Sequence, residues 1–124
     1  QYPVFAVLEA GKRLRALVAL PDEKVVAVGG TPDAMYFVAA GEVTVHLRTA
    51  LVTLKEGDFF GEMGLLSAQP RNADVVANGY CHLLVLYKKD FNQLLAHRPE
   101  VRAEIEAVTA RRSAANASEN KAAS

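Results

Sequence analysis

Residues 59–76 read FFGEMGLLSAQPRNADVV, and this stretch decides how the rest of the chain is interpreted. Gly61 lets the backbone adopt an unusual dihedral angle or approach a ligand closely. Glu62 to Ser67 fits one short helix, whose first amide groups would point outward and form an anion site. Pro70 stops that helix, and Arg71 then supplies a planar fork of donors suited to a phosphate. The stretch therefore predicts a phosphate site.

Two further residues extend this site from a phosphate to a nucleotide. Ala73 is small, so its N–H group can also approach a ligand oxygen. Glu62 would repel a phosphate and needs another partner, and a sugar hydroxyl fits because carboxylates accept hydrogen bonds from hydroxyl groups. Phosphate and ribose recognised side by side indicate a nucleotide.

Short apolar runs, separated by Gly and Pro turns, surround this stretch. They lie at 17–20, 25–28, 35–38, 43–47, 51–54, 75–77 and 83–87. Such short strands at a spacing near ten residues are typical of a sandwich, a roll or a small barrel. The segment before Leu17 looks helical, because Val4, Leu8 and Leu14 form a partial apolar stripe.

The C-terminal part of the chain favours helices. Asp90 fits the N-cap of a helix over 91–97, and Pro99 fits the first turn of a second helix. Val101, Ile105 and Val108 follow at helical spacing and would pack on the roll or on the ligand. Residues 113–124 are rich in Ala, Ser and Asn without an apolar stripe, which predicts a disordered tail.

The composition fits one domain and argues against several classes of function. The 124 residues include 14 basic and 14 acidic side chains, and this balance argues against a general nucleic-acid binder. No apolar run approaches the roughly 20 residues that span a bilayer. The three histidines are scattered without metal-ligand spacing, and the single cysteine, Cys81, is expected to be a buried hydrophobe. We therefore expect a binding protein, not an enzyme.

The central stretch resembles the phosphate-binding cassette of cyclic-nucleotide-binding domains, F-G-E-x-x-L-[LI]-x-x-x-x-R-[TS]-A-x-V. The matching positions are Phe60, Gly61, Glu62, Leu65, Leu66, Arg71, Ala73 and Val75. The segments 35–38 and 43–45 upstream, and 83–86 and 90–100 downstream, are similar to further parts of the family's pattern. The resemblance covers roughly residues 17–112, and several parts in the right order are more specific than one motif.

The resemblance implies an α+β, mainly β fold. This fold is an eight-stranded antiparallel β-roll, jelly-roll-like, with a short helix in the cassette and flanking N- and C-terminal helices. The domain would occupy residues 1–112, with an N-terminal helical part over 1–16, the roll over 17–87 and C-terminal lid helices over 88–112.

The resemblance also implies the roles of individual residues. Glu62 would bind the ribose 2′-hydroxyl and Arg71 the cyclic phosphate, with backbone amides near Gly61, Met63, Gly64 and Ala73 helping. Val45 and Val52 would line the base pocket, and Arg112 of the lid helix would contact the base. The ligand would be cAMP or cGMP, without a metal or a cofactor.

One departure from the family pattern bears on the ligand. Asn72 replaces the usual Thr or Ser, whose hydroxyl can contact both the phosphate and a guanine. We therefore favour cAMP over cGMP, although an Asn side chain can still donate a hydrogen bond. Whether Asn72 weakens binding is an open question at this point.

The resemblance is nearest to bacterial cyclic-nucleotide-regulated ion channels and cation/proton antiporters, because the connection 46–51 is short and no helix-turn-helix follows. We expect a cytoplasmic regulatory domain that gates a fused channel or transporter in an inner membrane. It would have no nucleic-acid partner, and it could form a homo-oligomer through its host protein. Two alternatives stay open: a roll that mediates assembly without binding nucleotide, and a cupin-like metal enzyme, which would need clustered His and Glu ligands.

Overall fold

Eight strands form two antiparallel sheets of four strands each in the structure, a computed structural model that describes the backbone of residues 14–123 and the side chains of 14–113. The first sheet has the order β1-β8-β3-β6 and the second β2-β7-β4-β5. The strands are β1 (Arg15–Ala19), β2 (Lys24–Val26), β3 (Ala34–Ala40), β4 (Val43–His46), β5 (Leu51–Leu54), β6 (Phe59–Phe60), β7 (Asp74–Ala77) and β8 (Cys81–Tyr87). The predicted eight-stranded antiparallel roll is confirmed.

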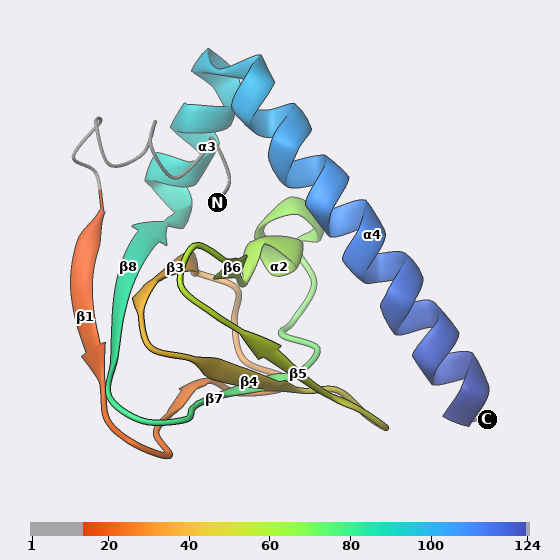
Figure 1. Ribbon diagram of the computed structural model, residues 1–124. Coiled ribbons are helices and arrows are strands. Elements are labelled where there is room, and N and C mark those ends of the chain that lie inside the picture. The colour runs from red at the N-terminus through yellow and green to blue at the C-terminus, as the bar shows by residue number, and fades with distance from the viewer. Residues whose placement is uncertain (1–13, 124) are drawn as a thin grey trace.

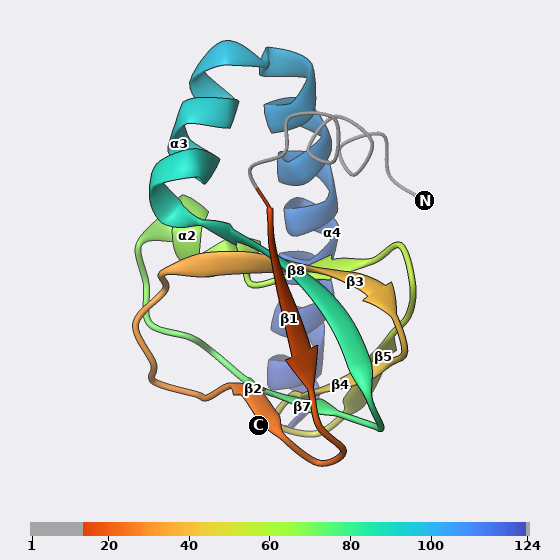
Figure 2. The same cartoon turned by 90° about the vertical axis from the view of Figure 1, so that its left-hand side faces the viewer.

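In the part of the chain that the structure describes, three helices accompany the roll. They are α2 (Glu62–Ser67), α3 (Lys88–His97) and α4 (Pro99–Ala123). Figure 1 shows α2 between the roll and α4, and Figure 2 shows α4 passing behind the strands, on the side away from β1. Among the residues that the structure describes, no helix is both long enough and apolar enough to cross a bilayer.

Within the first sheet, β3 and β8 contribute side chains to two cores, one on each face of the sheet, because successive residues of a strand point to opposite faces. On β3, Met35 and Phe37 face a helix-side core that also holds Ile105 of α4. Val38 of β3 and Leu83 of β8 face the roll core between the two sheets. The same strands therefore fix the helices on one side and close the roll on the other.

The apolar stripe predicted for the last helix is confirmed. Val101, Ile105 and Val108 are all buried in the helix-side core, and α4 begins at Pro99 as expected. Cys81 is also buried, as predicted, and its Sγ lies 3.0 Å from the carbonyl oxygen of Glu42.

Three boundaries differ from the prediction. Arg15 and Ala16 belong to β1, because they pair with Val85 and Leu84 of β8, and Leu14 before them is not helical. The rest of the expected N-terminal helix, residues 1–13, lies outside the described residues. Helix α3 begins at Lys88 with Tyr87 as its N-cap, so Asp90 lies in the first turn, where a carboxylate is favoured by the helix dipole.

The third correction concerns the predicted disordered tail. Helix α4 continues to Ala123, although residues 113–124 carry no apolar stripe. A stripe is needed for packing but not for helix formation, and this segment is rich in Ala, the residue with the highest intrinsic helix propensity.

Candidate functional site

A cavity of about 550 Å³ opens between the second sheet, the cassette and α4. Its lining is largely apolar on the strand side and carries charged side chains on the helix side. The lining residues are Val26, Val45, Leu47, Val52, Leu54, Phe60, Gly61, Glu62, Met63, Gly64, Leu66, Ser67, Gln69, Pro70, Arg71, Asn72, Ala73, Val75, Thr109, Arg112 and Ser113.

All ten site residues predicted from the sequence lie on this cavity. They come from three regions: the second sheet, the cassette and α4. The second sheet provides Val45 and Val52, α4 provides Arg112, and the cassette provides Gly61, Glu62, Met63, Gly64, Arg71, Asn72 and Ala73. The fold thus brings them together, while their contacts with a ligand stay a prediction.

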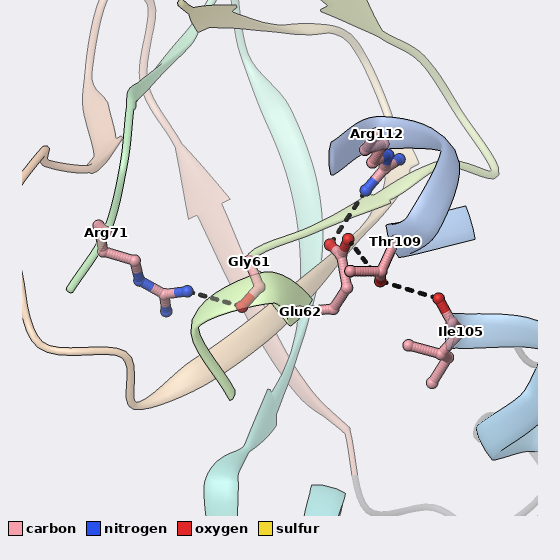
Figure 3. Close-up of polar contacts among 6 residues, drawn as sticks. All are labelled: Gly61, Glu62, Arg71, Ile105, Thr109 and Arg112. Carbon is pink, nitrogen blue, oxygen red and sulfur yellow. Dashed lines mark hydrogen bonds and ion pairs between the residues drawn. The ribbon is translucent and has the colours of Figure 1, made fainter. Parts of the chain in front are cut away.

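Arg71 is buried, and its guanidinium points back toward the start of α2 (Figure 3). Its Nη1 donates a hydrogen bond of 2.7 Å to the carbonyl oxygen of Gly61, and its Nη2 donates one of 2.5 Å to the carbonyl oxygen of Ala34. Nη2 also lies 3.6 Å from Oδ1 of Asp33. A guanidinium carries more N–H groups than these two bonds use, so it can also meet an anion in the cavity.

The turn between β2 and β3 fixes the backbone of Arg71 as well. The N–H of Gly29 donates to the carbonyl of Arg71 at 2.7 Å, and the N–H of Arg71 donates to the carbonyl of Gly30 at 2.9 Å. Both the main chain and the side chain of Arg71 are therefore held in place by neighbouring backbone.

Helix α2 occupies Glu62–Ser67, the bounds predicted from the sequence. Gly61 precedes it with a φ of 89°, a left-handed conformation that glycine adopts without strain. An added Cβ on Gly61 would lie 3.1 Å from Nη1 of Arg71, so the glycine also permits the close approach of the guanidinium.

Glu62 is 1% exposed, and both of its carboxylate oxygens are bonded to α4 (Figure 3). Oε1 accepts a hydrogen bond from Nη1 of Arg112 at 3.0 Å, and Oε2 accepts one from the hydroxyl of Thr109 at 3.0 Å. The guanidinium of Arg112 also lies over the ring of Phe59, 4.9 Å from its centroid. The structure therefore joins two residues that the sequence analysis placed in separate roles.

The apolar wall of the cavity comes from the second sheet and from β6. Val45 of β4 and Val52 of β5 are directly paired across the strands, so both side chains project from the same face. Phe60 adds an aromatic ring, which stacks on Tyr36 with ring centroids 5.0 Å apart. Burial, and then the carboxylate of Asp33, raise the pKa of Tyr36.

Several residues of the cavity were not predicted from the sequence, and Thr109, which bonds Glu62, is one of them. Thr109 lies four residues after Ile105 and three before Arg112, which places it on the same face of α4 as Arg112. That spacing could have revealed it once Arg112 had been selected.

Within residues 14–113, whose side chains the structure describes, no group of three or more His, Cys, Asp or Glu side chains is arranged to hold a metal ion. The cupin-like alternative requires such a group and gains no support from this part of the chain.

Comparison with known proteins agrees with the geometry of the cavity. The sequence pattern of the family described as "Cyclic nucleotide-binding domain" matches residues 17–98. Human cyclic nucleotide-gated channel beta-1 is 44% identical over 96 residues, which cover 72% of this chain and 8% of that protein. A cyclic nucleotide-gated potassium channel of Rhizobium etli is 38% identical over 96 residues, covering 77% of this chain and 27% of that protein. This chain therefore spans only a small part of these channels.

The fold is also similar to a solved structure. The catabolite activator protein of Thermus thermophilus superposes with a TM-score of 0.79 and 28% sequence identity. The match covers 97% of this chain and 59% of that one.

Proposed function

The chain belongs to the family of cyclic nucleotide-binding domains, and on that premise we propose that its cavity binds cAMP and that binding is coupled to α4. The observation that carries this proposal is the arrangement of charge on the cavity wall. A buried guanidinium, Arg71, and a buried carboxylate, Glu62, line one cavity of about 550 Å³ whose remaining wall is largely apolar. This is the complement of a ligand with a phosphate, a hydroxylated sugar and a flat base.

Each part of the nucleotide has a counterpart in the cavity. The cyclic phosphate is assigned to Arg71, with backbone amides of Gly61, Met63, Gly64 and Ala73 around it, because a guanidinium forms strong charge-assisted bonds with phosphate oxygens. The ribose hydroxyl is assigned to Glu62. The base is assigned to the apolar side near Val45 and Val52, where it would replace water against the strands.

The preference for cAMP rests on Asn72. It is an exposed residue on the rim of the cavity, at the position where the family's Thr or Ser contacts a guanine. Without that hydroxyl, cGMP loses one contact that cAMP does not use, and we expect cGMP to bind more weakly than cAMP.

Coupling to α4 follows from where that helix lies. Thr109, Arg112 and Ser113 of α4 form part of the cavity wall, so a ligand held there favours one position of the helix over others. Binding then shifts the equilibrium of α4 by the difference in ligand affinity between its positions. The relatives that match are channels, and we propose that this domain regulates a fused channel or transporter from the cytoplasmic side of its membrane.

Titration calorimetry of the protein with cAMP, cGMP and adenosine tests the proposal. We expect one saturable site for cAMP, weaker binding of cGMP, and no measurable binding of adenosine, which lacks the phosphate assigned to Arg71. Arg71→Ala should weaken cAMP binding about tenfold or more, because a hydrogen-bonded charge is lost.

The matched control is Arg111→Ala, which removes an arginine that is exposed on α4 and is not part of the cavity lining. Its affinity for cAMP should equal that of the wild type. Equal binding of cAMP and adenosine would refute the phosphate assignment, even if Arg71→Ala does not fold. No binding of any of the three would favour the alternative of an assembly module.

A further inference from the structure

Glu62, at the start of α2, is the residue of the cavity to which side chains of α4 are bonded. Its carboxylate is nearly inaccessible to solvent, while the side chain of its partner Arg112 is 23% exposed. Arg112 is held from a second direction by the ring of Phe59, 4.9 Å from its guanidinium carbon. A guanidinium that stacks on a ring and pairs with a carboxylate is fixed in both position and orientation.

Arg112 forms an ion pair with Glu62, whereas the hydrogen bond from Thr109 to Glu62 can be made or released. The hydroxyl oxygen of Thr109 lies 3.0 Å from Oε2 of Glu62 and 2.8 Å from the carbonyl oxygen of Ile105. A hydroxyl has one proton, so it donates to one of these acceptors at a time. Each carboxylate oxygen can accept more than one hydrogen bond, so a ligand hydroxyl can join Glu62 while α4 stays in place.

The charge of Glu62 opposes the binding of an anion. Nη1 of Arg71 bonds the carbonyl of Gly61, the residue next to Glu62, so a phosphate at Arg71 would share a partly enclosed cavity with this carboxylate. Repulsion between like charges is stronger in such a place than in bulk water. When α4 is docked, Arg112 offsets the charge of Glu62 and reduces that repulsion.

We propose that Arg112 is a positioning residue that acts on the nucleotide through Glu62, by neutralising and orienting its carboxylate. The inference rests on the proposed function. It differs from the base contact predicted from the sequence, because it needs no contact between Arg112 and the ligand. Linkage makes the effect reciprocal: docking of α4 strengthens binding of the anionic ligand, and the ligand strengthens docking of α4.

A double-mutant cycle between positions 62 and 112 tests the proposal, with cAMP affinity as the readout. Arg112→Gln leaves the Glu62 charge without its partner and should weaken cAMP binding about tenfold. Glu62→Gln removes that charge and keeps an acceptor for the ribose hydroxyl, so it should weaken binding less. The double variant should bind cAMP several times more tightly than Arg112→Gln alone, because no charge is left to repel the phosphate.

Matched variants separate this effect from a general loss of structure. Arg112→Lys keeps the positive charge and should stay within a few-fold of the wild-type affinity. Arg111→Gln removes a neighbouring, exposed charge from the same helix and should leave the affinity unchanged.

Hydrogen exchange of the amides over 105–112 provides a second readout that does not need Arg112→Gln to fold. Added cAMP should protect these amides in the wild type, and Glu62→Gln should lose most of this added protection. Protection that stays at the wild-type level in Glu62→Gln would contradict the proposal, since the contacts of α4 with the cavity would then account for all of the coupling without Glu62.

The outcomes of the cycle are distinct. A cAMP affinity that is higher in the double variant than in Arg112→Gln supports the proposal that Arg112 acts on the nucleotide through Glu62. A double variant as weak as the product of the two single losses, or an Arg112→Gln protein that binds like the wild type, would overturn it. Failure of the wild type to bind cAMP would instead refute the proposed function.

Discussion

Arg71 shows how much of a binding site is settled by a single residue and its immediate surroundings. Its main chain is bracketed by Gly29 and Gly30, and its guanidinium bonds the carbonyls of Gly61 and Ala34. The side chain is therefore already ordered, and a ligand that binds it loses little free energy to the ordering of that side chain. The conformation of the residues around Arg71 is as important as Arg71 itself.

Gly64 lies against these surroundings of Arg71, and replacing it should disturb them. A Cβ at this position would lie 2.6 Å from Cβ of Pro32 and 3.4 Å from Nη1 of Arg71. Gly64→Ala should therefore push α2 away from the turn before β3, lower the free energy of unfolding by about 1–3 kcal/mol, and weaken cAMP binding. The higher helix propensity of alanine, worth up to about 1 kcal/mol, offsets only part of this loss.

Urea unfolding and calorimetry of the same samples measure both effects. Gly79→Ala is the matched control, since a Cβ there would meet no atom within 4 Å. A Gly64→Ala protein that is as stable as Gly79→Ala and binds cAMP equally well would show that the close contact with Pro32 is unimportant.

The sequence was informative about the site where the chemistry is local. Glu62 and Arg71 could be selected from residue type and spacing within a single stretch. The bonds of Glu62 to Thr109 and Arg112 could not, because these residues are 47 and 50 positions away and meet Glu62 only through the path of α4. Such contacts depend on how α4 crosses α2, which no local pattern encodes.

The C-terminal end of helix α2 carries a strained residue. The helix ends at Ser67, and Ala68 follows with a φ of 58°, while its N–H donates to the carbonyl of Gly64 at 2.8 Å. The left-handed conformation costs a residue with a Cβ about 1–2 kcal/mol. Pro70, expected to stop the helix, comes two residues after this turn.

Ala68→Gly should therefore stabilise the protein. The expected gain in the free energy of unfolding is roughly 0.5–1 kcal/mol, since glycine relieves the strain but loses more backbone entropy on folding. Urea denaturation measures the gain, and cAMP affinity should not change, because Ala68 is exposed and does not line the cavity. A decrease in stability would show that the left-handed turn is not strained.

Helices and strands with a regular apolar pattern, or with residues typical of a helix start or a turn, were predictable from the sequence. Short elements and elements without an apolar pattern were not. The bounds of α2 and the start of α4 at Pro99 followed from turn and helix-start residues. Strand β6 comprises only Phe59 and Phe60, too few to show any alternation, and it forms only because β3 lies beside it. The extension of α4 beyond residue 112 was missed because the prediction relied on an apolar stripe.

The first sheet lies between the two cores, and α4 contacts both the helix-side core and the cavity. Three apolar residues pack α4 against the first sheet: Val101, Ile105 and Val108. Thr109 and Arg112 of the same helix donate hydrogen bonds to the carboxylate of Glu62. A change at the cavity can thus reach the helix through one short set of contacts. The architecture as a whole followed from the resemblance to the family, but this path required the structure.

Mapping of amide chemical shifts by NMR during titration with cAMP tests most directly that this cavity binds a cyclic nucleotide. We predict saturable shifts at residues 61–64 and 71–73, at Val45 and Val52, and along α4 at 105–112, with smaller changes elsewhere. Absence of shifts at a large excess of cAMP, or shifts confined to residues away from the cavity, would contradict the assignment.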